Sequence, residues 1–414
     1  MIVKGKVTQE STELTAIDVL LDSWSDFILV FNYSLGEDDL IKSLEATLDL
    51  APIVSGRKYT DENNIVYITG ANNGIDFEFL QYDHLSPGDA CVHNSDKQKY
   101  LPDNQTKHKH LLSKTSIKHA LLKIKVTSYT DVTILGLSIW HPLADGFSFI
   151  TFLQLWAGSF CKKNVTAIHP HRFNISNAVE TSVSEAAFDI SQRGQSWDEL
   201  KDFEEACFII PKKIIKKESS RDGDYTESDI LISFLWKKIA VVISASEAEE
   251  LLLIPVYNVR SIYETPTDYF GNYLYFAKVA LTKREIAGVE TTCLAEKIRE
   301  SSFKIFDDFE FYTSKILSLR QHHFVKNKSN YILKPIYEAT FGKGIFVNNL
   351  SSFPFSSIDF GRGGPIFIDC PLQEKSRFIT ILPSLTDAES YHIKINLPQE
   401  EMNELKSSLI HYKE

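Results

Sequence analysis

The order of hydrophobic and polar residues along the chain alternates between the period of a strand and the period of a helix. Residues 132–140 form a nearly continuous apolar run, which is typical of a strand buried on both faces. After an acidic start at 37–39, Leu40, Leu44 and Leu48 recur at helical spacing and predict an amphipathic helix. The same pattern predicts strands at 27–31, 65–68, 75–79, 121–126, 207–210, 251–256, 273–281, 377–382 and 391–397, and helices at 147–160, at 227–243, between 283 and 312, and from 400. The pattern therefore indicates an α/β protein.

Two polar stretches interrupt this pattern. Residues 83–115 contain prolines and several histidines, and we expect irregular surface structure there. The pattern dissolves again between 163 and 198, where we expect a crossover linker at 166–203. The linker divides the chain into an N-terminal half, 1–165, and a C-terminal half, 204–414.

Composition and charge exclude several classes of protein. A length of 414 residues suggests two or three domains, and 44 basic against 55 acidic residues give a net charge of −11, which does not favour a nucleic-acid partner. No apolar run approaches the ~20 residues of a membrane span, and the first ten residues lack the apolar core of a secretory signal. The five cysteines are scattered, as in a reducing compartment. We therefore expect a cytoplasmic protein with no nucleic-acid or membrane partner.

The first candidate for chemistry follows the apolar strand that ends at Trp140. His141 is followed by Pro142, which keeps it extended, and by Asp145 and Gly146 at the start of an apolar helix. A histidine fixed at a strand end can act as a general base near neutral pH. Alternatively, Asp145 simply caps the helix and His141 is an ordinary polar residue. The residues alone leave both interpretations open.

The second candidate is the run Asp359-Phe360-Gly361-Arg362-Gly363, which lies 218 positions after His141. A glycine-rich turn between strands is the simplest interpretation. A protein-kinase interpretation fails because no phosphate loop, His-Arg-Asp loop or strand lysine accompanies it. The paired histidines at 108/110, 169/171 and 322/323 lack metal-site spacing, so we expect no metal.

Together the two motifs resemble those of the BAHD acyltransferases, a CoA-dependent family with His-x-x-x-Asp-Gly and Asp-Phe-Gly-Trp-Gly signatures. Further similarities cover most of the chain, at 52–57, 226–237, 258–260 and 269–272. The resemblance implies two chloramphenicol-acetyltransferase-like mixed-sheet domains with a solvent channel between them. It also implies that a segment near 356–383 packs with the N-terminal half.

The resemblance further implies the role of each residue. His141 would deprotonate a hydroxyl or amine acceptor, which attacks the thioester of acyl-CoA. Asp145 would pair with Arg260 and, with Gly146, support the site, while Asp359, Gly361 and Gly363 would shape a loop. Acyl-CoA is then a co-substrate, the acceptor is a small specialised metabolite, no cofactor is permanently bound, and we expect a monomer.

The chain departs from the family pattern at two positions, where Arg362 and Leu350 replace tryptophans. Arg362 is expected at the surface, with a phosphate or oxyanion contact as alternatives, and Asn348 is a candidate amide donor. Ser233 and Lys237 share a helix face and are candidate CoA contacts. Two other functions stay open: a condensation-type enzyme that uses carrier-protein thioesters, and a non-catalytic binding relative.

Overall fold

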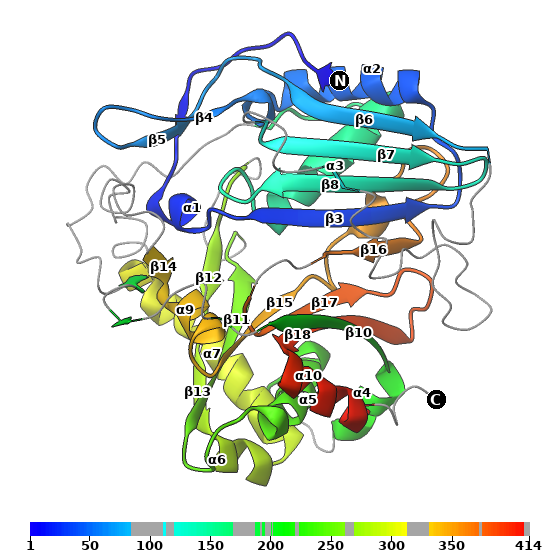
Figure 1. Ribbon diagram of the computed structural model, residues 1–414. Helices are drawn as coiled ribbons and strands as arrows, with labels where there is room; N and C mark the ends of the chain where they lie inside the picture. Colours follow the sequence, from blue (N-terminus) through cyan, green and yellow to red (C-terminus); the bar gives the residue numbers. More distant parts are fainter. Residues whose placement is uncertain are drawn as a thin grey trace.

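Two mixed β-sheets, one above the other, organise the protein (Figure 1). The computed structural model describes residues 1–83, 111–112, 120–168, 187–190, 193–194, 200, 202–219, 223–260, 269–312, 331–371 and 375–409. Most of the expected surface segment 83–115 and of the expected linker 166–203 lies outside these residues, as do Cys91 and all the paired histidines. The predicted α/β class with two mixed sheets is confirmed.

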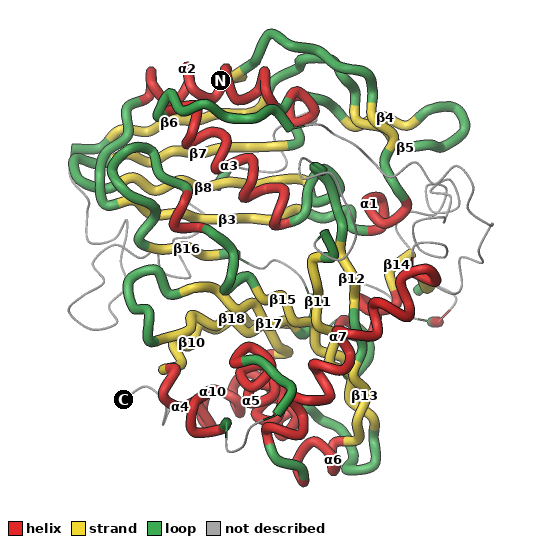
Figure 2. Tube along the Cα trace, turned by 180° about the vertical axis from the view of Figure 1, so that it is seen from behind, coloured by secondary structure: helices red, strands yellow, loops and turns green. Residues whose placement is uncertain are grey.

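The upper sheet belongs mainly to the N-terminal half. Its strands lie in the order β1 (Ile2–Val3), β6 (Ile75–Gln81), β7 (Leu122–Ser128), β8 (Thr133–Trp140), β3 (Trp24–Phe31) and β16 (Phe367–Asp369). Only β6 and β7 run parallel. The helices α2 (Glu37–Leu50) and α3 (Gly146–Phe160) cover the face that is seen in front in Figure 2.

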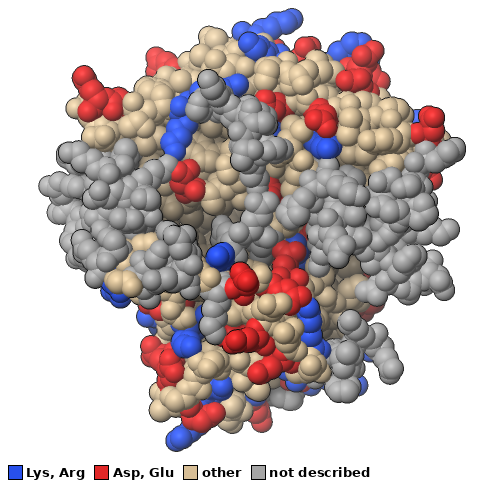
Figure 3. All heavy atoms as spheres, viewed as in Figure 1, with Lys and Arg blue, Asp and Glu red and all other residues tan. Residues whose placement is uncertain are grey.

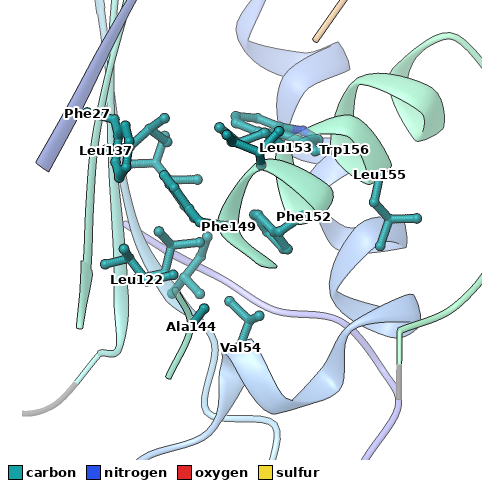
Figure 4. Packing of buried hydrophobic residues seen from close by; sticks show 14 of the residues in the cluster. Phe27, Val54, Leu122, Leu137, Ala144, Phe149, Phe152, Leu153, Leu155 and Trp156 are labelled. Carbon is teal, nitrogen blue, oxygen red and sulfur yellow. The ribbon is translucent and has the colours of Figure 1, made fainter. Parts of the chain in front are cut away.

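Apolar side chains on one stripe of α3 fill the space between that helix and the sheet. Phe149, Phe152 and Trp156 are fully buried and approach Phe27 and Leu137 of the strands (Figure 4). The buried Leu40, Leu44 and Leu48 of α2 join the same core, as their spacing predicted. This packing fixes the start of α3, which follows directly after the His141 turn.

The lower sheet belongs to the C-terminal half. Its order is β10 (Phe203–Pro211), β18 (Ser390–Pro398), β17 (Phe378–Pro383), β15 (Gly344–Asn349) and β11 (Glu250–Asn258), with β12 (Leu274–Phe276) and β13 (Val279–Thr282) both paired to the outer edge of β11. Its helices are α4 (Lys212–Glu218), α5 (Glu227–Val242), α6 (Lys283–Gly288), α7 (Thr291–Tyr312) and α10 (Gln399–Leu409). A second apolar core, built around α5, lies between these helices and the sheet.

Smaller elements connect and flank the two sheets. They are β2 (Thr12–Glu13), β4 (Lys58–Thr60), β5 (Val66–Ile68), β9 (Ala187–Asp189) and β14 (Tyr331–Leu333), the helices α1 (Ala16–Leu20) and α9 (Lys334–Thr340), and the 3-10 turns Pro52–Ser55 and Phe355–Ser357. On the face shown in Figure 3, acidic side chains gather over β10, β18 and α10, in keeping with the negative net charge.

The single strand predicted at 273–281 is wrong, because the structure has β12 and β13 with a break between them. Both strands pair with β11 in one register, which places Ala277 opposite Pro255. The Ala277 N–H donates to the Pro255 carbonyl at 2.9 Å, but proline has no N–H to return. Because Pro255 cannot donate the second hydrogen bond of this pair, the ladder is interrupted there.

The chain crosses once from the lower sheet back to the upper one. β16 pairs antiparallel with β3, and its residue Asp369 contacts Lys394 of β18 at 2.6 Å. The segment 356–383, expected to pack with the N-terminal half, contains this strand. The crossing places residues of both halves around one shared cavity.

Candidate active site

His141 lies in a tight turn directly after β8. Its N–H donates to the Ser23 carbonyl at 2.9 Å, and its own carbonyl accepts the Ala144 N–H at 3.1 Å. The side chain lines a cavity of about 910 Å³ to which both halves contribute. Its Nδ1 atom is buried and has no hydrogen-bond partner among the described residues. Backbone contacts therefore fix the residue, while Nδ1 of the imidazole is left without a side-chain partner in the part of the chain that the structure describes.

Asp145 caps α3 and also forms an ion pair with Arg260. Its Oδ1 accepts the Ser148 N–H at 2.9 Å, the geometry of an N-cap. The Arg260 guanidinium approaches both oxygens, with Nη1–Oδ2 at 2.7 Å and Nη2–Oδ1 at 3.1 Å. The Asp145 carboxylate is only 1% exposed, and the Tyr273 N–H completes its shell at 3.0 Å. The Asp145 carboxylate therefore forms the helix cap and the ion pair at the same time, although the sequence analysis treated the two roles separately.

Asn272 joins this arrangement from the C-terminal half. Its Nδ2 donates to the His141 carbonyl at 2.9 Å and to Asp18 Oδ1 at 2.8 Å. The preceding carbonyl, of Gly271, accepts Arg260 Nη2 at 2.8 Å. The turn 270–272 thus holds both ends of the motif that begins at His141. The sequence drew attention to this turn only through the family resemblance and assigned Asn272 and Asp18 no role.

The walls of the cavity are apolar with a few polar groups. The N-terminal half contributes residues 19–27, Gly146 and Phe147, and the C-terminal half contributes side chains of β11, β12, β15, β17 and α9. A concave, mostly apolar site of this volume is at the upper end of the ~300–1,000 Å³ range for sites that take drug-sized molecules.

Comparison with known proteins identifies the family. The sequence model of the Transferase family matches residues 27–411, almost the whole chain. The chain belongs to this family and is a BAHD transferase. Deacetylvindoline O-acetyltransferase of Catharanthus roseus is 24% identical over 286 residues, which are 64% of this chain and 62% of that protein. The chain therefore aligns with less than two thirds of the length of this curated relative.

Solved structures share the fold of this BAHD transferase. TRI101 of F. sporotrichioides, crystallised with coenzyme A and T-2, superposes with a TM-score of 0.72 at 15% identity, over 96% of this chain and 97% of that one. Vinorine synthase superposes with a TM-score of 0.71 at 17% identity, over 100% of this chain and 97% of that one. At such identities the likeness establishes the arrangement of the two halves.

The second motif of this BAHD transferase forms a loop against the N-terminal half. Asp359 Oδ1 accepts the N–H groups of Gly361 at 2.7 Å and Gly363 at 2.8 Å, while both glycines have positive φ. The Tyr33 hydroxyl donates to the Gly363 carbonyl at 2.7 Å. Burial raises the pKa of Tyr33 to about 12, so the hydroxyl keeps its proton at neutral pH. The loop is thus closed by its own carboxylate and tied to the end of β3.

The two candidate donor contacts near this loop lie in different environments. Arg362 is exposed and is not among the residues that line the cavity, in agreement with the expected surface position. Asn348, on β15, lines the cavity.

The structure places Ser233 and Lys237, the candidate CoA contacts, outside the lining of the cavity. Ser233 is fully buried in the C-terminal core, and its hydroxyl donates to the Asp229 carbonyl within α5 at 2.8 Å. The Lys237 ammonium donates to the Val289 carbonyl. Neither residue lines the cavity. An inward-facing serine on a helix satisfies its hydroxyl on its own backbone, which is the arrangement found here.

The described residues also bear on metal binding and on membrane insertion. Within that part of the chain, no group of three or more His, Cys, Asp or Glu side chains is placed to hold a metal ion. No helix in the same residues combines the length and apolar character needed to cross a membrane.

Proposed function

We propose that this BAHD transferase moves an acyl group from acyl-CoA to the hydroxyl or amine of a small specialised metabolite, with His141 as general base. The observation that carries the proposal is His141 itself, held by backbone bonds in the wall of a cavity shared by both halves. Support also comes from the relatives, one described as an O-acetyltransferase and one crystallised with coenzyme A.

The proposed reaction needs one base and one electrophile. His141 accepts the proton of the acceptor O–H or N–H, and the freed lone pair attacks the thioester carbonyl. The tetrahedral intermediate collapses, its C–S bond breaks, and the CoA sulfur takes the proton back from the imidazolium. Acyl-CoA is a co-substrate here, and no step uses a permanently bound cofactor.

The other residues position this base and the intermediate. We assign Asp145, Arg260 and Asn272 to holding the His141 turn, and Asp359, Gly361 and Gly363 to shaping the loop behind it. Asn348 is the stronger candidate for stabilising the oxyanion, because its amide lines the cavity and the Arg362 side chain does not.

His141→Ala tests the assignment directly. Loss of a general base lowers the rate by ~10²–10⁴-fold, measured as kcat for acyl transfer from a panel of acyl-CoAs to hydroxylated and amino acceptors. The control is His392→Ala, because His392 is not among the residues that line the cavity. Titration calorimetry with CoA should give the same affinity in His141→Ala and wild type. A kcat within threefold of wild type would contradict the role of His141.

The same assay separates the two alternatives. Turnover of free acyl-CoA without a carrier protein argues against a condensation-type enzyme. CoA binding without any turnover would instead indicate a non-catalytic relative.

We further propose that the protein acts as a monomer in the cytoplasm with small-molecule partners only. Light scattering during gel filtration tests the oligomeric state.

A further inference from the structure

One face of the C-terminal sheet turns towards the cavity. Along β15 and β17, Ile345, Val347, Ile379 and Ile381 are buried in the core beneath the sheet. Successive side chains of a strand point to opposite faces. Phe346 and Asn348 of β15, and Phe378 and Thr380 of β17, are therefore on the other face, and all four line the cavity.

Thr380 carries a buried hydroxyl on this face of the sheet. The residue is only 1% exposed, and its Oγ1 has no hydrogen-bond partner among the described residues. Ser376, four positions earlier on the same cavity wall, is 3% exposed and has an unpartnered hydroxyl as well. Buried polar groups are nearly always hydrogen-bonded, because burial without a partner is costly. Two such hydroxyls in one cavity indicate that the partner is a ligand.

Asn348 and Thr380 are direct neighbours across the two strands. They form a register pair in the parallel ladder of β15 and β17. The amide of Asn348 and the hydroxyl of Thr380 can each donate a hydrogen bond. A single carbonyl or hydroxyl oxygen placed above this pair would reach both groups.

The register pair two positions earlier, on the same face of the sheet, is aromatic. Phe346 and Phe378 stack with ring centroids 5.3 Å apart, and Phe276 of β12 adds a third ring 5.6 Å from Phe346. Two residues along a strand correspond to ~7 Å. The surface therefore offers an aromatic platform about 7 Å from a pair of hydrogen-bond donors.

Building on the proposed function, we infer that Thr380, Asn348, Phe346 and Phe378 form a substrate subsite for a ring-bearing apolar group with a carbonyl or hydroxyl oxygen. The ring packs on the phenylalanines, and the oxygen accepts from Thr380 and from the Asn348 Nδ2 hydrogen that the proposed oxyanion contact does not use. Such a group can come from the acyl chain of the thioester or from the acceptor, and the chemistry of recognition is the same for both.

A matched pair of probes measures the hydrogen bond without any turnover. 2-Acetylnaphthalene and 2-ethylnaphthalene have the same fused rings, but only the first has a carbonyl. We expect the wild-type protein to bind the ketone about five- to tenfold more tightly, the effect of one or two hydrogen bonds. Thr380→Val should lower this preference, because only the Asn348 hydrogen bond remains, and should raise Tm, because the isosteric change removes an unpaired buried hydroxyl. Thr60→Val, at an exposed position of β4, should do neither.

The aromatic platform is tested with the same two probes. Phe378→Leu should weaken the binding of both probes to a similar extent and leave the preference for the ketone intact. Phe303→Leu, at an exposed position of α7, is the control. A ketone preference in Thr380→Val as large as that of the wild type, or Phe378→Leu binding that equals wild type, would overturn the inference.

Competition experiments then distinguish the two sources. If the subsite takes the acyl chain, benzoyl-CoA displaces 2-acetylnaphthalene and acetyl-CoA does not. If it takes the acceptor, neither thioester displaces the probe. Because binding requires no catalysis, the measurements can be repeated in His141→Ala. Failure of the catalytic proposal is thereby separated from failure of the subsite.

Discussion

At the scale of single residues, the carboxylate of Asp145 both caps α3 and pairs with Arg260. It accepts four hydrogen bonds, from the Ser148 N–H, the Tyr273 N–H and both Arg260 Nη groups. We expect Asp145→Ala to lower the free energy of unfolding by ~3–5 kcal/mol, because the buried guanidinium loses its partner. Urea unfolding of Asp145→Ala, Arg260→Met and the double variant measures the coupling between the two side chains.

A capping role alone would give a smaller effect. Loss of an N-cap costs ~0.5–2 kcal/mol, and Thr226→Ala at the N-cap of α5 calibrates that range in this chain. A coupling free energy near zero between Asp145 and Arg260 would show that the ion pair contributes nothing to stability.

The residues that could be predicted from the sequence are those whose signal is local. His141, Asp145 and Gly146 fall within six positions, and Asp359 to Gly363 within five. Asn272 could not be assigned, because its bond to the His141 carbonyl spans 131 positions. Thr380 is a single threonine in a strand pattern, and only the fold shows that its hydroxyl is buried and unpaired. The Asp145–Arg260 pair spans 115 positions and was predicted only through the family resemblance, because contacts between distant segments leave no spacing to recognise.

At the scale of elements, the loop 359–363 depends on backbone conformations that favour glycine. Gly361 has φ +96°, and a Cβ placed there would meet Cys161 Sγ at 3.5 Å, an ordinary contact. We therefore expect Gly361→Ala to cost ~1–2 kcal/mol from backbone strain alone. Gly288→Ala, at the end of α6 with open space and no positive φ, should not destabilise. Equal unfolding midpoints in urea for the two variants would contradict this account.

The success of element prediction followed the strength of the pattern. The helix 37–50 was predicted from its helical period, and the strand 133–140 from its nearly continuous apolar run. Residues 273–281 resemble a single strand in sequence, but the proline that divides the strand lies on the neighbouring strand β11. The strand β16 has only three residues and was not predicted, and the structure shows it as a strand that pairs with β3.

At the scale of the whole molecule, one buried lysine joins the two sheets. Lys394 of β18 lies 2.6 Å from Asp369 of β16, 2.9 Å from Glu205 of β10 and 2.7 Å from the Cys370 carbonyl. Lys394 and Asp369 are fully buried. Burial alone would lower the pKa of Lys394, but Asp369 and Glu205 raise it above its ordinary value. The ammonium therefore stays charged in the folded protein. Cys370, whose carbonyl Lys394 contacts, and Thr380, the register partner of Lys394, both line the cavity.

Removing one partner of the Lys394–Asp369 pair should therefore destabilise the contact between the two sheets. Lys394→Met leaves the Asp369 carboxylate buried without its cation, and we expect a loss of ~3–5 kcal/mol in calorimetry and urea unfolding. Adding Asp369→Leu should recover part of that loss, because the uncompensated charge is gone. Lys406→Met removes a partly exposed pair with Glu204 and should cost at most ~1 kcal/mol.

The raised pKa of Lys394 determines how the stabilisation by its ammonium depends on pH. The stabilisation is complete below the ordinary lysine pKa of ~10.4 and is lost only as the pH rises above that value. A double variant no more stable than Lys394→Met would refute the buried pair as the junction between the sheets.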